Sequence, residues 1–260
     1  MLKERVMPLI DCSSASQRFI RKLQDITRLT TEEQQAVLDL PMTIRCYSKG
    51  QDIHRDGDAS LECCLLLEGF ATSCKLLSDG RRQITAFHVP GDMPNLQDLH
   101  APTMDRSITA TVPTTVAFVK HSSLRNLLSR HPGLWQVLWQ STLIDAAVAR
   151  EWMVGVGQRS ALERLAHLIC EMLVRLEAVG LAAGQSFRLP VGQTDLADTL
   201  GLSTVHVNRM VQELRRRELI TWTGTQLTVV ARQELQAVAS FDATYLQQLR
   251  VEQDEPHCAA

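Results

Sequence analysis

The chain has 260 residues, of which 45% are hydrophobic and 22% are charged, and its formal net charge at pH 7 is −2. This composition supports the cores of one large or two modest domains, and the near-neutral charge excludes a protein that packages nucleic acid in bulk. Sequence-specific DNA binding stays open, because it needs only a local patch of positive charge.

The cysteines and the N-terminus indicate a cytoplasmic protein. The seven cysteines are an odd number and include no CxxC pair, which favours reduced thiols over a redox sensor or a metal cluster. The first residues, MLKERVMPLIDCSSAS, lack the sustained apolar segment of a secretory signal, and no run is long enough to span a bilayer. We therefore expect no membrane partner.

The N-terminal half is expected to be mainly β-structure. Residues 1–16 are predicted to form a loose arm, and Thr30 and Glu33 have the spacing of a capping box that begins a short helix ending near Leu40. Strands are predicted at Thr43–Tyr47, Cys63–Leu67, Thr72–Leu77, Gln83–Val89, Ser107–Val112 and Thr115–Lys120. Short strands that alternate with glycine-containing turns predict a compact antiparallel sandwich or jelly roll.

Helical periodicity returns at Ser122. A short helix is predicted over 122–130 and a long one over 133–154. The apolar arc of the long helix is broad enough to contact both its own β domain and a second copy of the chain. Packing only within its own chain is the alternative for this helix.

Two glycines, Gly155 and Gly157, predict an interruption of the long helix that would serve as a hinge. Ser160 and Glu163 then form a second capping box, which predicts a new helix ending near Ala178. After this helix, the small residues of 180–186 predict a linker.

Residues 193–217, QTDLADTLGLSTVHVNRMVQELRRR, have the pattern of a helix, a tight turn and a second helix. Gly201 falls at the turn, where glycine adopts a positive φ at the least cost, and Ser203 falls at the N-cap of the second helix. The apolar residues at inner-face positions are Leu196, Ala197, Leu200, Leu202, Val207 and Met210.

The segments after this motif predict a β-hairpin and a terminal helix. Leu219–Trp222 and Gln226–Val230 flank a Thr-Gly-Thr turn, which is typical of the wing of a winged helix. A last helix is predicted over 233–250.

The second helix of the motif has the features of a DNA-reading helix. In helix-turn-helix proteins the N-terminal end of this helix enters the major groove. Residues 201–217 contain four arginines and one acid, which gives a focused basic patch in a near-neutral protein. The candidate DNA contacts are Ser203, Thr204, Val205, His206, Asn208, Arg209 and Arg215.

Four segments in this order resemble the Crp/Fnr family of bacterial transcription regulators: Glu68-Gly69, Asp79–Ile84, Val89–Asp92 and Leu196–Arg209. The resemblance extends over nearly the whole chain. It implies an α+β protein with an antiparallel β-roll or jelly-roll sensor domain at 17–132, a long dimerisation helix at 133–156 and a winged helix-turn-helix DNA-binding domain at 157–250. It also implies a homodimer on palindromic double-stranded promoter DNA in the nucleoid, with RNA polymerase as a further partner.

The effector positions of the family are only partly retained. In its cAMP-binding members, a Gly-Glu pair follows the Pro-Gly-Asp turn and an Arg-Ser pair follows later, and they hold the ribose and the cyclic phosphate. The corresponding residues here are Asn95-Leu96 and Arg106-Ser107. Leucine accepts no hydrogen bond, and each ribose hydroxyl buried unpaired would cost about 1–3 kcal/mol. This argues against cAMP, and gating by another ligand stays open.

No resident cofactor or metal is expected. The oxygen-sensing members of the family hold an iron–sulfur cluster with several N-terminal cysteines, but only Cys12 lies in the N-terminal arm here. Haem binding would depend on a single histidine, and such histidines are more often structural. The histidines considered for it are His54, His88, His100 and His121.

The reading helix implies an operator unlike the familiar ones. Arg209 matches the family arginine that reads guanine through O6 and N7. Well-studied members carry a glutamate four residues earlier, and Val205 replaces it here, so the half-site should differ from TGTGA or TTGAT. His206 and Asn208 are further contacts to base or phosphate, whereas Ser203 and Thr204 are suited to phosphate contacts. For His206 and Asn208 the alternative is a contact to solvent or to the DNA backbone without specificity.

Two other classes of protein fit the sequence less well than a transcription regulator. An enzyme is disfavoured, because the chain has no nucleophile elbow, phosphate-binding glycine loop or HExxH motif. A winged helix that binds protein is disfavoured by the basic segment between Arg209 and Arg217.

Overall fold

The protein is described by a computed structural model over residues 12–247. The N-terminal elements are α1 (Cys12–Ile26), α2 (Thr31–Leu38), β1 (Thr43–Tyr47), β2 (Asp52–His54), β3 (Glu62–Glu68), β4 (Ala71–Leu76), β5 (Arg82–His88), the 3-10 helix η1 (Leu96–His100), β6 (Ser107–Ala110), β7 (Thr114–Lys120) and α3 (His121–Arg130). They are followed by α4 (Pro132–Gln158), α5 (Ala161–Ala178), β8 (Ala182–Ala183), β9 (Ser186–Arg188), α6 (Gln193–Leu200), α7 (Thr204–Arg216), β10 (Ile220–Thr223), β11 (Gln226–Val229), α8 (Arg232–Ala239) and α9 (Thr244–Gln247). No helix in this part of the chain is long and apolar enough to cross a membrane.

The N-terminal helix is longer than expected. The predicted loose arm is wrong at residues 12–16, which belong to α1, and the remainder of that arm lies outside the described residues. Phe19, Leu23 and Ile26 recur at helical spacing and are buried, so this helix forms because it covers the β domain with an apolar face.

The predicted antiparallel β domain is confirmed. One sheet has the order β1-β7-β3 and the other has the order β2-β6-β4-β5, and every pairing is antiparallel. Buried residues from both sheets, among them Ile53, Leu66 and Phe118, form one apolar cluster between the layers. Strand β2 was not predicted, because three residues interrupted by a register shift leave no measurable periodicity.

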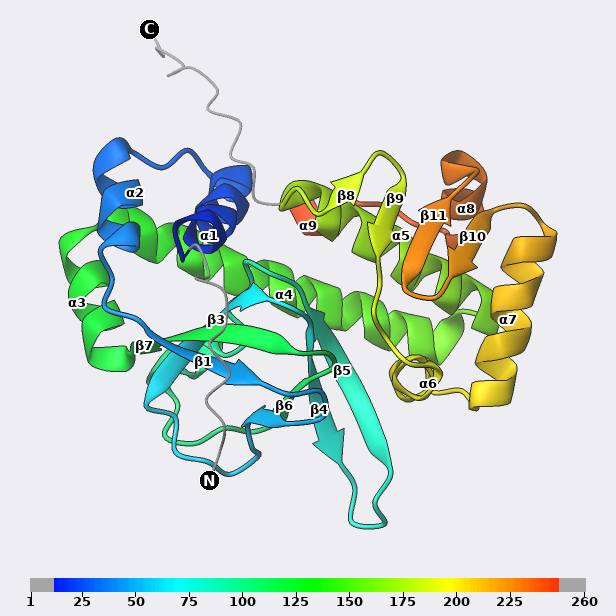
Figure 1. Cartoon of the computed structure of the whole chain (residues 1–260), viewed down its shortest axis with the longest axis horizontal. Helices are drawn as coiled ribbons and strands as arrows, with labels where there is room; N and C mark the ends of the chain where they lie inside the picture. Colours follow the sequence, from blue (N-terminus) through cyan, green and yellow to red (C-terminus); the bar gives the residue numbers. More distant parts are fainter. Residues whose placement is uncertain (1–11, 248–260) are drawn as a thin grey trace, which may run out of the picture.

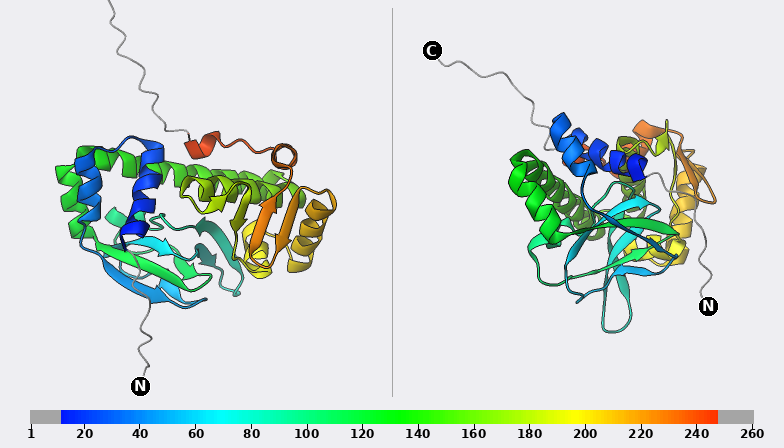
Figure 2. Two further views of the ribbon diagram at one scale, coloured as in Figure 1. Left: turned by 45° about the horizontal axis from the view of Figure 1, so that its top comes forward. Right: turned by 60° about the vertical axis from the view of Figure 1, so that its left-hand side comes forward.

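The long helix α4 has 27 residues and runs the length of the molecule, from the β-sheets to the C-terminal domain (Figures 1 and 2). The predicted interruption at Gly155 and Gly157 is wrong, because α4 continues through both. Each glycine costs a helix only about 1 kcal/mol, and the flanking turns offset that cost. The chain turns instead at Arg159, which is extended, and Ser160 and Glu163 cap the start of α5 as predicted.

The C-terminal domain has a four-stranded sheet of order β10-β11-β9-β8. The predicted linker over 180–186 is wrong, because this segment contains the β8–β9 turn, with Gly184 at φ 60. The wing is confirmed as β10–β11. The single predicted terminal helix is two helices, because Ser240 adopts a left-handed conformation that ends α8; residues 248–250 of that prediction lie outside the described chain.

Gly69 and Gly80 provide a matched test of turn geometry in the β domain. Both have a positive φ, 87 and 86. A Cβ on Gly69 would lie 2.5 Å from Thr114 Oγ1 and 2.7 Å from the Pro113 carbonyl, whereas a Cβ on Gly80 meets nothing within 4 Å.

We expect Gly80→Ala to lower the free energy of unfolding by about 1–2 kcal/mol through backbone strain alone. Gly69→Ala should cost roughly 1–3 kcal/mol more, because its methyl group also collides with the backbone of the neighbouring turn. Denaturant unfolding of the two variants measures the difference, and equal losses would contradict the described packing of Gly69.

His88 is a buried titratable group of the β domain. Its Nε2 lies 2.7 Å from the hydroxyl of Ser73. Burial lowers the pKa of His88 to about 3, so the ring is neutral in the folded protein at pH 5 to 8. In the unfolded chain the ring would titrate near its ordinary value of about 6.5.

Because the folded pKa lies below the unfolded one, stability from His88 is fully present above pH 6.5 and is lost as the pH falls. Between pH 7.5 and pH 5 this group should cost about 2 kcal/mol of unfolding free energy. His88→Gln should remove that part of the pH dependence, and the exposed His100→Gln should not. Denaturant unfolding at several pH values between 5 and 7.5 tests this prediction. If the unfolding free energies of His88→Gln and the parent chain fall in parallel as the pH is lowered, the prediction is wrong.

Candidate nucleic-acid interface

Helices α6 and α7 form the predicted helix-turn-helix. Gly201 has φ 63 and ends α6 in the left-handed region, where glycine is least strained. The hydroxyl of Ser203 accepts a hydrogen bond of 3.2 Å from the backbone N–H of His206, as expected of an N-cap. The predicted inner-face residues are buried or half-buried against the domain core: Leu196, Ala197, Leu200, Leu202, Val207 and Met210.

The opposite face of α7 is open. This helix lies at the outer edge of the C-terminal domain (Figure 1). Val205 is 79% exposed, and Thr204, Asn208 and Arg209 are exposed too. Within residues 12–247, the Arg209 guanidinium has no hydrogen-bond or ion-pair partner, so all of its donors are available to a ligand.

The predicted contact residues divide into two groups along α7. Those between Ser203 and Arg209 lie together in its first two turns, and His206 there is half-buried. Arg215 lies about 9 Å further along the helix axis, at the rise of 1.5 Å per residue, and is half-buried. Arg215 is therefore separate from the group that surrounds Arg209.

The arginines at the end of α7 are engaged within the protein. The carboxylate of Glu213 accepts from Arg216 over two bonds of 2.8 Å and from Arg217 over 2.7 Å. These hydrogen bonds lower the pKa of Glu213 to about 2. A phosphate that bound Arg216 or Arg217 would have to compete with this acid.

Asn208 is held by a residue that the sequence reasoning did not select. Gln193 donates to Asn208 Oδ1 over 2.8 Å, and Asn208 donates back to Gln193 Oε1 over 3.0 Å. This reciprocal amide pair connects the first residue of α6 to the exposed face of α7. Fifteen residues separate the two amides, so no local spacing indicated the contact.

A second unpredicted contact connects this domain to the β domain. Arg82, on β5, pairs with Asp195 over 2.6 Å and with Asp198 over 2.8 Å, and both acids are on α6. The neighbouring Gln83 donates to the carbonyl of Thr199 over 3.2 Å. The first helix of the motif is therefore attached directly to a strand of the β domain.

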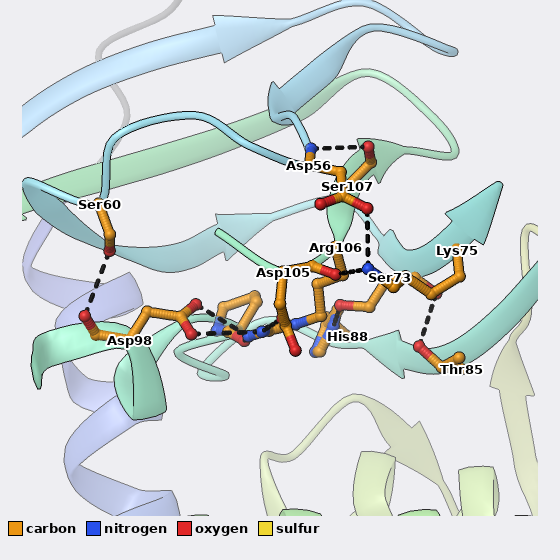
Figure 3. A network of polar contacts seen from close by, with 11 residues as sticks. Asp56, Ser60, Ser73, Lys75, Thr85, His88, Asp98, Asp105, Arg106 and Ser107 are labelled. Atoms are coloured by element: carbon orange, nitrogen blue, oxygen red, sulfur yellow. Dashed lines mark hydrogen bonds and ion pairs between the residues drawn. The ribbon is translucent and has the colours of Figure 1, made fainter. Parts of the chain in front are cut away.

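Protein groups occupy the polar atoms of the predicted effector residues, and Figure 3 shows two of these residues, Arg106 and Ser107, with their partners. Asn95 is fully buried, accepts from the backbone N–H of Cys64 over 2.7 Å and donates to the carbonyl of Glu62 over 2.8 Å. Leu96 is buried in the apolar cluster beneath η1. The hydroxyl of Ser107 accepts from the backbone N–H of Asp56 over 3.1 Å.

Arg106 is buried and forms an ion pair with an acid of its own domain. Its guanidinium meets the Asp98 carboxylate over 3.1 and 3.3 Å. Burial raises the pKa of the Asp98 carboxyl, and Arg106 partly offsets that rise. Asp98 was not selected from the sequence, because no spacing rule connects it to Arg106.

Metal-ligating side chains do not gather in the described part of the chain. Among residues 12–247, no three His, Cys, Asp or Glu side chains converge as a metal site would require. The side chain of Cys12 lies outside this description. Burial raises the pKa of the Cys63 thiol to about 12, which makes it a poor thiolate at neutral pH.

Comparisons with known proteins agree with both halves of this architecture. The Crp-like helix-turn-helix domain matches residues 163–238, and the cyclic nucleotide-binding domain matches residues 44–131. The nitrogen fixation regulation protein FixK of Rhizobium meliloti is 31% identical over 180 residues, which are 69% of this chain and 79% of that protein. The transcriptional activator protein FnrL of Cereibacter sphaeroides is 29% identical over 204 residues, which are 76% of this chain and 80% of that protein.

A solved structure supports the same assignment. The structure of FixK2 from Bradyrhizobium japonicum superposes with a TM-score of 0.71 at 31% identity, covering 78% of this chain and all of that one. The order of the domains, the geometry of α6 and α7 and these relatives lead to one conclusion. The chain belongs to the Crp/Fnr family and is a DNA-binding transcription regulator, not an enzyme.

Proposed function

We propose that the chain is a homodimer that reads a palindromic promoter site with α7. The observation that carries this proposal is the exposed first half of α7, where Arg209 has an unoccupied guanidinium beside the exposed Val205. An exposed arginine without a partner, on a helix end whose free N–H groups attract phosphate, is suited to a DNA groove.

The dimer is supported by the exposed apolar stripe of α4. Trp135, Trp139 and Leu143 recur every four residues and are 45%, 56% and 40% exposed, and Met153 continues the same face. The opposite face of α4 is buried against the chain's own β domain. Large apolar side chains in such a row are unfavourable in water, and a second copy of α4 would cover them.

A two-fold dimer fixes the form of the operator. Its two α7 helices would enter successive major grooves, so the site would be a palindrome with half-sites about one helical turn apart. In each half-site, Arg209 would read guanine and Val205 would contact a thymine methyl. The Gln193 amide leaves Asn208 fewer free groups for a base, so the specificity would rest mainly on Arg209 and Val205.

RNA polymerase is the partner we propose, because several matched relatives are named as transcriptional activators, and the setting would be the nucleoid in the cytoplasm. No cAMP, haem or iron–sulfur cluster is needed in this proposal. The absence of such a ligand from the proposal is supported by Asn95, Arg106 and Ser107, because their polar groups already form hydrogen bonds within the protein.

Arg209→Ala should abolish specific promoter binding while the dimer stays intact. Loss of one bidentate contact to guanine removes about 1–3 kcal/mol, which is roughly a 5- to 150-fold loss of affinity for each half-site. Arg81→Ala, an equal change at an exposed arginine of the β4–β5 turn, should have no effect. Gel shifts and footprints on promoter fragments measure this, and an unchanged footprint with Arg209→Ala would exclude α7 as the reading helix.

Trp139→Glu should convert the dimer to a monomer, because it places a charge in the centre of the apolar stripe. Leu61→Glu, at a residue of the β domain that is 71% exposed, makes a comparable change outside the stripe and should leave the dimer unaffected. Sedimentation equilibrium of both variants tests the interface. A Trp139→Glu protein that remains fully dimeric would rule out this face of α4.

A further inference from the structure

The β domain contains a buried guanidinium that already holds an anion from its own chain. The side chains of Arg106 and Asp98 are 10% and 6% exposed. Arg106 Nη2 lies 3.1 Å from Asp98 Oδ2, and Nη1 lies 3.3 Å from Oδ1, so the two planar groups meet fork to fork (Figure 3). This bidentate arrangement is the one in which arginine also binds a phosphate.

The carboxylate is held in place by its surroundings. Asp98 lies on η1, where its backbone N–H donates to the Asn95 carbonyl over 3.0 Å and its carbonyl accepts from the Ser60 hydroxyl over 3.2 Å. Asn95 is in turn fixed to β3 by two hydrogen bonds. The Arg106 guanidinium also donates to the Pro94 carbonyl over 2.8 Å and to exposed Asp105 over 2.6 Å.

We infer that the Asp98 carboxylate occupies the place of an anionic ligand at Arg106. Because this site is already filled, the β domain binds no nucleotide there. The domain has the fold of cyclic nucleotide-binding domains, and such a nucleotide carries one phosphate that requires a cationic partner. A phosphate that approached Arg106 would have to displace Asp98 and would leave a buried carboxylate without its counter-ion.

The pair also fixes the element that connects the roll to α4. Leu96 and Leu99 of η1 pack in one apolar cluster with Leu134 and Leu138 of α4. The His100 ring lies edge-on to Trp135, with ring centroids 6.0 Å apart. The Asp98–Arg106 pair thus keeps η1 seated on α4 without a small molecule. Only the step from α4 to the dimer rests on the proposed function, because α4 is the proposed dimer helix. Anion binding at Arg106 can be tested without DNA.

Chemical rescue tests the inference. Asp98→Ala should lower the thermal midpoint of the full-length protein by on the order of 10 °C, because the buried Arg106 charge loses its buried partner and keeps only the exposed Asp105. Acetate at about 0.1 M should then restore several degrees relative to sodium chloride of equal ionic strength, because its carboxylate can occupy the vacated site. Inorganic phosphate should act in the same way. Asp105→Ala removes an exposed carboxylate from the same arginine and should show neither the loss nor the rescue.

Two further variants make the test specific. Asp98→Ala combined with Arg106→Met should lose the acetate rescue, because no guanidinium remains to bind the anion. If Asp98→Ala fails to fold, Asp98→Asn keeps the shape of the side chain and removes its charge. It should show a smaller loss of midpoint and no acetate rescue, because its amide still fills the site. Rescue that persists without Arg106, or a midpoint for both Asp98 variants equal to that of the parent chain, would overturn the inference.

Nucleotide binding to the parent protein supplies an independent outcome. Titration calorimetry with cyclic AMP and cyclic GMP should give no saturable binding up to about 1 mM, where a ligand would contribute only about 4 kcal/mol. Saturable binding at micromolar concentration that is lost in Arg106→Met would show that the arginine serves a nucleotide, and would overturn the role assigned to Asp98. None of these results depends on whether Arg209 reads DNA.

Discussion

A buried ionic network around Arg175 holds the sensor domain, the long helix and the DNA-binding domain in one arrangement. Arg175, on α5, pairs with Asp92 over 2.9 Å and with Glu171 over 3.2 Å, and it donates to the carbonyl of Phe87 over 2.8 Å. Asp92 follows β5, and it also pairs with Lys22 of α1 over 2.7 Å. One guanidinium therefore connects elements from both domains.

The same network extends to α4 and α9. Glu171 is completely buried and accepts from the Trp152 indole over 3.0 Å and from the Tyr245 hydroxyl over 2.8 Å. Burial acts to raise the pKa of Asp92, but Lys22 and Arg175 hold it well below its ordinary value. Loss of one partner would leave another charge buried and unpaired, which costs about 3–5 kcal/mol in other buried pairs. The position of the DNA-binding domain thus depends on polar contacts that are all satisfied together.

This arrangement defines how a change in the β domain could reach α7. Arg82 of β5 pairs with the acids of α6, and η1 packs on α4. The β domain therefore contacts both the first helix of the helix-turn-helix and the long helix that leads to the DNA-binding domain. A shift of either contact would therefore change the position of α7 relative to the β domain. The internal Asp98–Arg106 pair favours the arrangement seen here, because it occupies the place from which a ligand could act.

The sequence alone predicted most of the elements and the place of the candidate reading residues on α7. Capping boxes at Thr30 and Ser160 and the glycine at 201 follow local rules, and the tertiary structure confirms them. Arg209 and Val205 could be assigned because the pattern around Gly201 sets the phase of α7. The continuity of α4 through Gly155 and Gly157 could not be predicted. The low helix propensity of glycine is a weak local preference, and packing along the whole helix overrides it. Only the tertiary structure decided which charges meet, since Arg82 with Asp195, Gln193 with Asn208 and Arg106 with Asp98 are brought together by packing, not by spacing along the chain.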